Sequence, residues 1–363
     1  MHHAEACHAA RPPRTHRRTA LATFRLWLVL VGGGALLPFG AASAATEATV
    51  AGTSFRGTTG ERHWLEFQSK AEKAGNGEIR LRMLIRGELG SEEQIVSGLR
   101  RGRVQYANLS SLVASTVVPE TALLYAPYLF TDAAEADYVL DTYLAPEFAK
   151  LFAQRGLELI VFYDLGNQQI WSRRKPLLTP ADARGVRFRV SASKSAELLG
   201  KALQADLIPL GFADIVPSLQ TGLIEAGENA ISLYARTGAA PEAPHLTITD
   251  HSMSQSVIVA DKRWWDRLPP AHRDILRRSF PDAATIRTAV RAEQERDLAQ
   301  AATLRFKVYR LTPQQKAQWI AATRVTHPEL IRAIGGESAR LYAGIEQARR
   351  KWAARPVAAA SQR

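Results

Sequence analysis

The stretch Leu203–Asn229 reads Leu-Gln-Ala-Asp-Leu-Ile-Pro-Leu-Gly-Phe-Ala-Asp-Ile-Val-Pro-Ser-Leu-Gln-Thr-Gly-Leu-Ile-Glu-Ala-Gly-Glu-Asn. Just before it lies the apolar, strand-like run Gly185–Val190, which contains Arg189. The residues after Phe212 predict a helix that stops at Gly222, because glycine favours helix ends. Strand and helix therefore alternate here, which is typical of an α/β fold, and the stretch has the make-up of one wall of a ligand cleft.

The rest of the chain repeats this alternation. Apolar residues and arginines alternate from Ile79 to Ile85, which is strand periodicity. Thr58 and Glu61 have the spacing of a capping box at the start of an earlier helix. A β-α-β-α-β opening extends to about Leu109, and a long helix is expected from about Asp282 to Phe306. The pattern predicts a sheet flanked by helices.

The length and the order of elements predict two lobes joined by more than one strand. A second α/β pattern occupies residues 166–254, and the chain crosses back near residue 255. We expect lobe 1 to comprise 45–166 and 255–294, lobe 2 to comprise 167–254 and 295–352, and 353–363 to form a disordered tail.

The first 44 residues resemble a secretory leader. A basic region precedes the apolar stretch Leu26–Phe39, and Ala42-Ser43-Ala44 forms a small-residue exit, so we expect cleavage after about Ala44. A membrane anchor is the alternative, but the apolar stretch is shorter than the ~20 residues of a spanning helix. Arg17-Arg18 only partly matches a twin-arginine signal, so ordinary secretion is the default.

Composition excludes several kinds of chemistry. Without the leader the chain keeps 42 Lys+Arg against 34 Asp+Glu, and it loses Cys7, its only cysteine. The remaining chain therefore has no disulfide, no thiol nucleophile and no cysteine metal ligand. The scattered arginines lack the aromatic interleaving of nucleic-acid platforms, so no nucleic-acid partner is expected, although the basic surface could attract anionic solutes.

Catalytic and metal motifs are also absent. The histidines beyond the leader, none with metal-ligand spacing, are His63, His245, His251, His272 and His327. The chain has no H-E-x-x-H, G-x-S-x-G, Walker A or G-x-G-x-x-G motif. We expect no catalytic residue, metal or cofactor, although a triad of distant Ser, His and Asp stays open. His251 is interpreted as a structural or cleft-rim histidine.

Arg189 is the central binding candidate, because a guanidinium pairs bidentately with a carboxylate in a way that lysine cannot. Strand alternation places Arg187 on the same face, so the pattern alone does not separate the two. Asn229 can donate and accept hydrogen bonds without adding charge, or it can be a turn residue. Phe212 as a plain sequence feature is more often core.

These segments resemble the solute-binding proteins of tripartite ATP-independent periplasmic (TRAP) transporters, over roughly residues 53 to 350. Gly87–Gly90, Gly98–Gly102, Ala126–Phe130 and Trp265–Pro269 carry the resemblance further along the chain. The family implies a two-lobed, periplasmic-binding-protein-like fold with an interlobe cleft, and a long helix that spans both lobes. It further implies these site residues: Arg189 holding the solute carboxylate, Asn229 bonding the same group, Phe212 lining the ligand, and Ser110 and Ser111 facing the ligand. Glu228 is assigned to holding the lobe or hinge together, because an acid close to an anionic ligand would oppose binding.

One position departs from the family pattern. Where many members have Gly-x-Arg, which supplies a second cation to the cleft, this chain has Gly166-Asn-Gln168. Gln168 can hydrogen-bond a ligand but cannot neutralise charge, which favours a monocarboxylate over a dicarboxylate. Arg173 or Arg174 could compensate if either points inward.

The resemblance implies a periplasmic receptor that delivers a small carboxylate solute to integral membrane permease subunits driven by an ion gradient. A binding module that reports to a periplasmic sensor is the alternative, and an exported enzyme is a weaker one. A neighbouring permease gene pair would favour the first. The identity of the solute, the oligomeric state and the particular permease lie beyond the sequence.

Overall fold

The computed structural model of this protein describes residues 45–191 and 193–355. The predicted leader and its cleavage site lie outside the described residues, as does the predicted tail from residue 356 onward. Within the described part of the chain, no helix combines the length and the apolar character that a membrane crossing needs.

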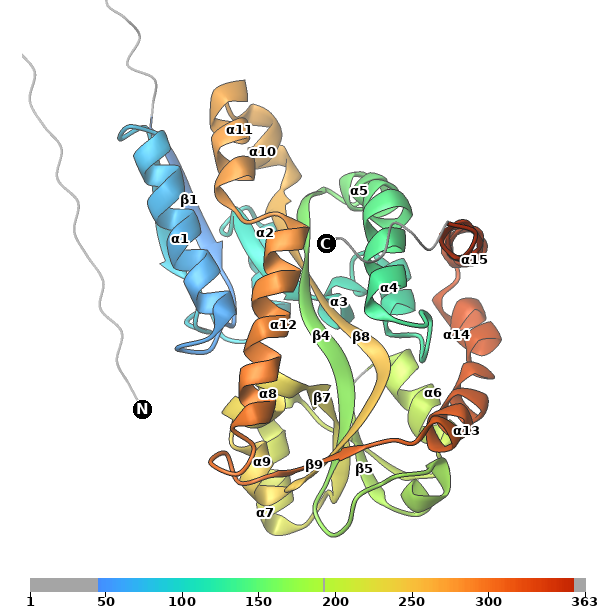
Figure 1. Cartoon of the computed structure of the whole chain (residues 1–363). Helices are drawn as coiled ribbons and strands as arrows, with labels where there is room; N and C mark the ends of the chain where they lie inside the picture. Colours follow the sequence, from blue (N-terminus) through green and yellow to red (C-terminus); the bar gives the residue numbers. More distant parts are fainter. Residues whose placement is uncertain (1–44, 192, 356–363) are drawn as a thin grey trace, which may run out of the picture. The chain divides into compact units, whose positions relative to one another are not determined.

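Nine strands of the described residues form one mixed sheet in the order β2-β1-β3-β8-β4-β7-β5-β6, with β9 beside β8. The strands are β1 (Thr46–Ala51), β2 (Ile79–Leu84), β3 (Tyr106–Ser110), β4 (Leu157–Ser172), β5 (Arg187–Val190), β6 (Asp206–Pro209), β7 (Ala226–Ala230), β8 (His245–Asp261) and β9 (Lys307–Arg310). Strands β1, β2 and β3 are parallel at one end of this order, and β5, β6 and β7 are parallel at the other. The long antiparallel strands β4 and β8 connect the two groups (Figure 1).

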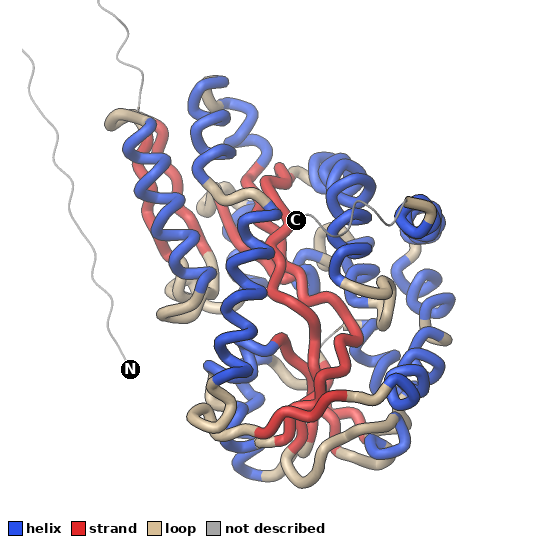
Figure 2. Tube along the Cα trace, viewed as in Figure 1, coloured by secondary structure: helices blue, strands red, loops and turns tan. Residues whose placement is uncertain are grey.

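Helices cover both sides of the strands (Figure 2). The α-helices are α1 (Thr59–Ala74), α2 (Glu92–Arg100), α3 (Ser111–Ala114), α4 (Ala133–Val139), α5 (Ala145–Gln154), α6 (Lys194–Ala202), α7 (Ile215–Thr221), α8 (Ile231–Arg236), α9 (Ala239–Glu242), α10 (Lys262–Arg267), α11 (Pro270–Ser279), α12 (Ala283–Ala299), α13 (Pro313–Arg324), α14 (His327–Ile334) and α15 (Ser338–Ala353). Tighter 3-10 turns form η1 (Pro119–Tyr125), η3 (Pro180–Ala183) and η4 (Phe212–Asp214), and η2 (Leu140–Leu144) is a π-helix. Thr58 caps α1 by accepting from the Glu61 N–H, where the sequence predicts a cap, and a capping box of Ser91 and Gln94 begins α2.

Alternation along the strands divides the apolar core into separate clusters. In β3, Tyr106 packs with Trp64 of α1 in one cluster, whereas Leu109 packs with Phe148 of α5 in another. Successive strand side chains point to opposite faces, so one strand serves two helical layers. The predicted α/β fold with helices on both faces of the sheet is confirmed.

The strands β4 and β8 carry irregular pairing where they pass between the two groups. The register shifts between Asp164 and Asn167 and again between Gln168 and Ile170. Gly166 lies in the first shift, with a φ of +86° that favours glycine. We call residues 164–168 of β4 and 250–255 of β8 the crossover. Its position matches the predicted return of the chain near residue 255.

Helix α12 lies along β4 and contacts α1 beside the first strand group and α8 beside the second (Figure 1). Ile286 packs in the cluster around β1, and Leu298 packs in the cluster beside β7. Between them, Gln294 Nε2 donates to the carbonyl of Leu165 at 2.7 Å. The predicted helix across both lobes is therefore confirmed, although it ends at Ala299 rather than Phe306, because turns follow it.

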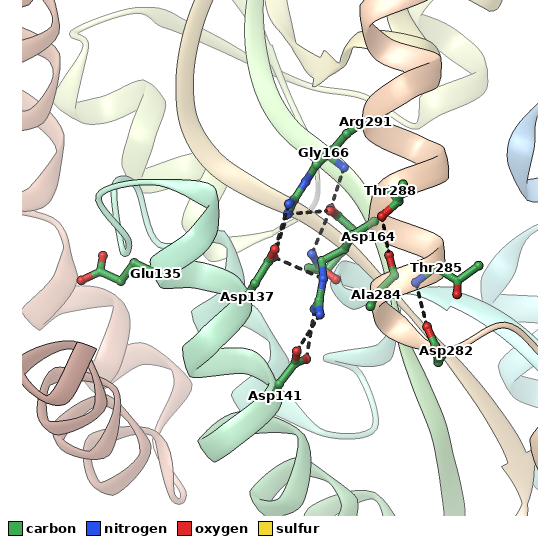
Figure 3. A network of polar contacts seen from close by, with 12 residues as sticks. Glu135, Asp137, Asp141, Asp164, Gly166, Asp282, Ala284, Thr285, Thr288 and Arg291 are labelled. Atoms are coloured by element: carbon green, nitrogen blue, oxygen red, sulfur yellow. Dashed lines mark hydrogen bonds and ion pairs between the residues drawn. The ribbon is translucent and has the colours of Figure 1, made fainter. Parts of the chain in front are cut away.

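Two arginines fasten α12 to the opposite helices (Figure 3). Arg291 pairs bidentately with Asp137 at 2.8 and 2.7 Å, and Arg287 pairs with Asp141 at 3.0 and 2.6 Å. Asp141 lies in the π-helix η2, between α4 and α5. Arg291 also lies 3.4 Å from Asp164 in the crossover. These charges hold α12 against both the crossover and α4.

Asp164 is the buried acid of this network. Its Oδ1 accepts from the Gly166 N–H at 2.8 Å and from Gln255 Nε2 at 3.1 Å. Burial raises the pKa of the Asp164 carboxyl, while the Gly166 hydrogen bond and the charge of Arg291 lower it. The acid therefore ties the two crossover strands together, and its ionised form carries a cost of burial.

The last two helices share an apolar cluster with the first strand group. Leu330 of α14 and Leu341 and Ile345 of α15 lie in the same cluster as Leu109 and Phe148. Residues 327–353 contact η1, α4 and η2, and α14 also contacts α6, which follows β5 of the second strand group. Their apolar faces meet the apolar faces of those helices, a long-range match that periodicity does not report. The lobe boundaries stay a prediction.

Gly166→Ala is expected to destabilise the protein more than Gly77→Ala. Both glycines have a φ of +86°, so both variants carry the backbone strain of a left-handed alanine, about 1 kcal/mol or more. Only at Gly166 would the new Cβ also collide with the Gln294 amide, since nothing lies near Gly77. Urea unfolding of both variants measures the difference. Equal losses would show that the packing of Gln294 on the crossover is dispensable.

Asp164→Asn is expected to gain stability over the wild type as pH rises from about 4. Because burial raises the folded-state pKa of Asp164, the unfolded chain binds fewer protons in this window, and the wild type loses stability there. Asp282, at the start of α12, is the control with the opposite sign, since the Thr285 N–H lowers its pKa. Asp282→Asn should lose relative stability as pH rises toward about 4, below the window of Asp164, because a lowered folded-state pKa places the change below the unfolded value. Thermal unfolding at several pH values tests both, and a parallel loss in Asp164→Asn would mean that its pairing with Arg291 dominates.

Candidate functional site

The carboxyl ends of the parallel strands from both groups face each other. Phe55 follows β1 in the first group, and Phe212 follows β6 in the second. Their ring centroids lie 6.1 Å apart, so the loops after these strands are in contact. Ligands of open α/β sheets bind outside the carboxyl ends of the strands. We use the name facing edges for the residues that follow the carboxyl ends of the parallel strands in both groups, together with the crossover.

Arg189 lies at the carboxyl end of β5 and is only 6% exposed. Its Nε and Nη2 donate to the carbonyl of Leu210 at 3.1 and 2.8 Å. Burial lowers the pKa of Arg189, and the charges of Glu228 and Asp214 partly oppose this effect. Among the described residues, no carboxylate lies within ion-pair distance of it.

Arg187 is held differently, which separates two arginines that strand alternation leaves equivalent. Its guanidinium lies 3.3 Å from Glu225 and donates to the carbonyl of Gly222 at 2.9 Å. Arg189 has five N–H donors, of which two point to Leu210. Its outer edge, with Nη1 and the second proton of Nη2, has no hydrogen-bond partner within the described chain. That edge can receive a carboxylate bidentately.

Asn229 lies in β7 and not in a turn. Its Oδ1 accepts from the indole Nε1 of Trp171 at 2.9 Å. An indole only donates, so this bond fixes the amide with its Nδ2 donor directed away from Trp171. Gly227 makes room for the ring, because a Cβ there would collide with it. Trp171 was not anticipated, and the glycine two residues before Asn229 was its only sequence signal.

Glu228 joins the second strand group to the crossover. Its Oε2 lies 2.6 Å from His251 Nε2, and His251 Nδ1 lies 2.7 Å from Thr249 Oγ1. His251 is 0% exposed, so it has no access to a solute. The structure therefore places His251 among structural histidines, and Glu228 in a link between β7 and β8.

Gln168 lies in the crossover and is 7% exposed. Its Nε2 donates to Ser254 Oγ at 3.2 Å, and its Oε1 is a buried acceptor without a partner in the described chain. Arg173 and Arg174 do not replace the missing cation. Arg173 Nη1 donates to the carbonyl of Leu219 at 2.9 Å, and Arg174 pairs with Glu225 at 2.7 Å. Both are engaged within the second strand group.

Ser110 ends β3 and is bound to an acid that the sequence analysis missed. Its N–H and hydroxyl both donate to the carboxylate of Glu92, and Thr53 Oγ1 donates to the same carboxylate at 3.4 Å. The hydroxyl oxygen of Ser110 also caps Val113 N–H of α3 at 3.2 Å. Acids are common in the first turn of helices, so the position of Glu92 in α2 gave no signal of this role.

Phe212 is 39% exposed, so the alternative that it belongs to the core is wrong. Its contact is Phe55, which is itself 37% exposed and which the sequence analysis missed. The pair lies where the loops of the two strand groups meet. Elsewhere in the described residues, no group of three or more His, Cys, Asp or Glu side chains is placed to hold a metal ion.

Comparison with known proteins identifies relatives along most of the chain. Residues 53–333 match the family described as bacterial extracellular solute-binding protein, family 7. The 2,3-diketo-L-gulonate-binding periplasmic protein YiaO of Escherichia coli K12 is 26% identical over 64% of this chain and 71% of its own. The C4-dicarboxylate-binding periplasmic protein DctP of Vibrio cholerae is 26% identical over 74% of this chain and 81% of its own.

Solved structures share the fold. The TRAP periplasmic solute binding protein from Desulfovibrio salexigens with bound orotic acid has a TM-score of 0.78 and 20% identity, over 84% of this chain and 99% of that one. The TRAP protein from Ochrobactrum anthropi has a TM-score of 0.76 and 23% identity, over 85% and 97%. The fold is therefore that of two-lobed binding proteins. By the family match over residues 53–333, the chain belongs to bacterial extracellular solute-binding protein family 7, the solute-binding proteins of TRAP transporters, and not to an enzyme family.

Proposed function

We propose that this protein captures a small carboxylate-bearing solute between its facing edges and delivers it to the ion-gradient-driven permease of a TRAP transporter. The main support is the buried guanidinium of Arg189, whose outer edge has no acid partner in the described chain. A buried charge without a counter-charge is costly, and a solute carboxylate would remove that cost.

Asn229 adds the second contact to the carboxylate. Its Nδ2 is free to donate because Trp171 occupies its oxygen. Hydrogen bonds to a charged group contribute roughly 1.5–3 kcal/mol each, and micromolar affinity requires about −8 kcal/mol net. The Arg189 edge and the Asn229 amide would supply charged hydrogen bonds, and the exposed ring of Phe212 would add apolar contact, against the cost of ordering the ligand.

A monocarboxylate is the proposed class of solute. Gln168 supplies no charge, and Arg173 and Arg174 are engaged by Leu219 and Glu225. A second carboxylate would therefore lack a cation from these positions. The names of relatives include both a dicarboxylate and a sugar acid, so this preference rests on the side chains of this chain.

Closure of two lobes around the solute is the proposed mechanism. In this proposal residues 45–166 and 255–294 move as one lobe with the helices of 327–353, and 167–254 with 295–326 form the other. A ligand that contacts both lobes favours the closed form by its differential affinity. The crossover, with Gly166 and two register shifts, is where the backbone would bend.

The proposed location is the periplasm, after removal of the leader at about Ala44. Relatives are named as periplasmic proteins, and the first 44 residues have the pattern of an exported chain. The basic surface of the remaining chain would help to attract an anionic solute.

Arg189→Ala and Arg189→Lys are expected to abolish stabilisation by carboxylic acids. A ligand that binds only the native state raises the unfolding temperature by mass action. We expect monocarboxylates in a thermal-shift panel to stabilise the wild type, and calorimetry to show at least about tenfold weaker binding in both variants. Lysine keeps the charge but loses the fork.

Arg187→Ala is the matched control, because Arg187 lies two residues earlier on the same strand and pairs with Glu225. It should bind the same acids as the wild type. The proposal fails if no acid stabilises the protein, or if the acids that do so stabilise the Arg189 variants equally.

Phe55→Leu and Phe212→Leu are each expected to weaken solute binding about two- to tenfold, because an aromatic pair contributes roughly 0.5–1.5 kcal/mol beyond its area. If the two rings act together across the facing edges, the double variant should have the same affinity for the solute as the single variant with the lower affinity. Calorimetry with the best acid of the panel measures this cycle, and Leu223→Ala is the control at another exposed apolar residue. Additive losses would argue against a shared contact in the closed form.

A further inference from the structure

Glu92 is an acid held at the facing edges without a basic partner. Its carboxylate accepts from Ser110 N–H, Ser110 Oγ and Thr53 Oγ1, and it forms no ion pair with a lysine or arginine of the described chain. Ser110 ends β3, in the strand group opposite that of Arg189. The facing edges therefore carry an unpaired acid on one side and an unpaired guanidinium on the other.

Strand β8 connects these two sides. Ser110 is paired in register with Ser256, and Gln168 is paired with Ser252 and bonded to Ser254. Alternate residues of a strand lie on one face, so Ser252, Ser254 and Ser256 form a row between Ser110 and Gln168. Burial raises the pKa of the Tyr125 hydroxyl, and the charges of Glu92 and Glu228 raise it further, so Tyr125 lies near acids of both strand groups.

The amide of Gln168 is bonded through its nitrogen. Gln168 Nε2 donates to Ser254 Oγ at 3.2 Å. This leaves Gln168 Oε1, an atom that can only accept, buried and without a partner in the described chain. Such an atom costs stability until a donor reaches it.

We infer that the solute carries a hydrogen-bond donor, a hydroxyl or an ammonium group, at the pole opposite its carboxylate, and that Glu92 and Gln168 determine this specificity. The inference rests on the proposed binding of a carboxylate at Arg189. Both groups accept, so a donor satisfies them, whereas a second carboxylate would meet an acid and an unfilled acceptor.

The environment of Glu92 supports a donor from the solute. Burial raises the pKa of the Glu92 carboxyl, and the charge of Glu93 raises it further, while the Ser110 hydrogen bonds lower it. An ammonium or hydroxyl group would stabilise the charged form in the same way as the Ser110 bonds. A carboxylate there would add like-charge repulsion.

The test is calorimetric titration of the exported protein with matched acids. The series consists of valerate, its terminal hydroxyl and terminal amino derivatives, glutarate, and the sugar acids gluconate and galacturonate. We expect the wild type to bind the hydroxyl- or amino-bearing acids at least about tenfold more tightly than valerate or glutarate. Glu92→Leu should remove this preference while valerate binding persists.

Glu92→Gln separates the two donors and keeps the shape of the side chain. Its amide oxygen still accepts from a hydroxyl, but it no longer attracts an ammonium group, so only an ammonium preference would fall. Gln168→Arg should improve glutarate binding by restoring a cation. Glu93→Gln, at the exposed neighbouring acid, is the control and should leave the order of affinities unchanged.

The outcomes distinguish the donor specificity inferred here from the proposed function as a carboxylate receptor. If acids bind through Arg189 but the wild type does not prefer donor-bearing ones, or if Glu92→Leu keeps the preference, the inference is overturned and the receptor function stands. If no acid binds in an Arg189-dependent manner, both fail. Circular dichroism of each variant confirms that the fold is intact, and Glu92→Gln alone decides the ammonium case if Glu92→Leu does not fold.

Discussion

The antiparallel pair of β4 and β8 is the constraint on which the other parts of this structure depend. The pair runs from Leu157 opposite Asp261 to Ser172 opposite His245, so two long strands belong to both strand groups. Because every backbone group in such a ladder needs a partner, each shift in register is short, and two of the shifts lie at the crossover. Helix α12 packs along the same strands, and its ion pairs with Asp137 and Asp141 attach it to the first group.

Charged side chains of the framework have partners within the protein, whereas those of the proposed site are incompletely paired. Arg187, Arg173 and Arg174 are all engaged by Glu225 or by carbonyl groups of the second strand group, which stiffens that group. Arg189 is bound only to a carbonyl, and Glu92 only to hydroxyl and N–H groups. Burial of incompletely paired charges lowers stability, and a solute with complementary poles would recover that loss on binding. The cost in the empty protein is thus a source of affinity in the complex.

Much of the fold could be predicted because local patterns report burial. The alternation at Ile79–Ile85 and the capping residues before α2 required no distant partner. Candidate residues from the family motif were harder to rank. Arg187 and Arg189 share a strand face in any ideal geometry, and only the positions of Glu225, Gly222 and Leu210 separate them. In the sequence, Glu92 has the pattern of an ordinary acid at a helix start. Its contact with Ser110 is made in the folded protein, and the pattern of one helix does not predict that contact.

The sequence by itself determined the α/β class, the family and the absence of cysteine chemistry beyond the predicted leader. The periodicity of apolar residues and the order of motifs are properties of the chain that survive without a partner. Only the tertiary structure decided that α14 and α15 pack on the first strand group, that Trp171 orients Asn229, and that Gln168 keeps an unfilled acceptor. Each of these depends on which distant atoms meet, and local periodicity specifies a buried face without specifying what covers it.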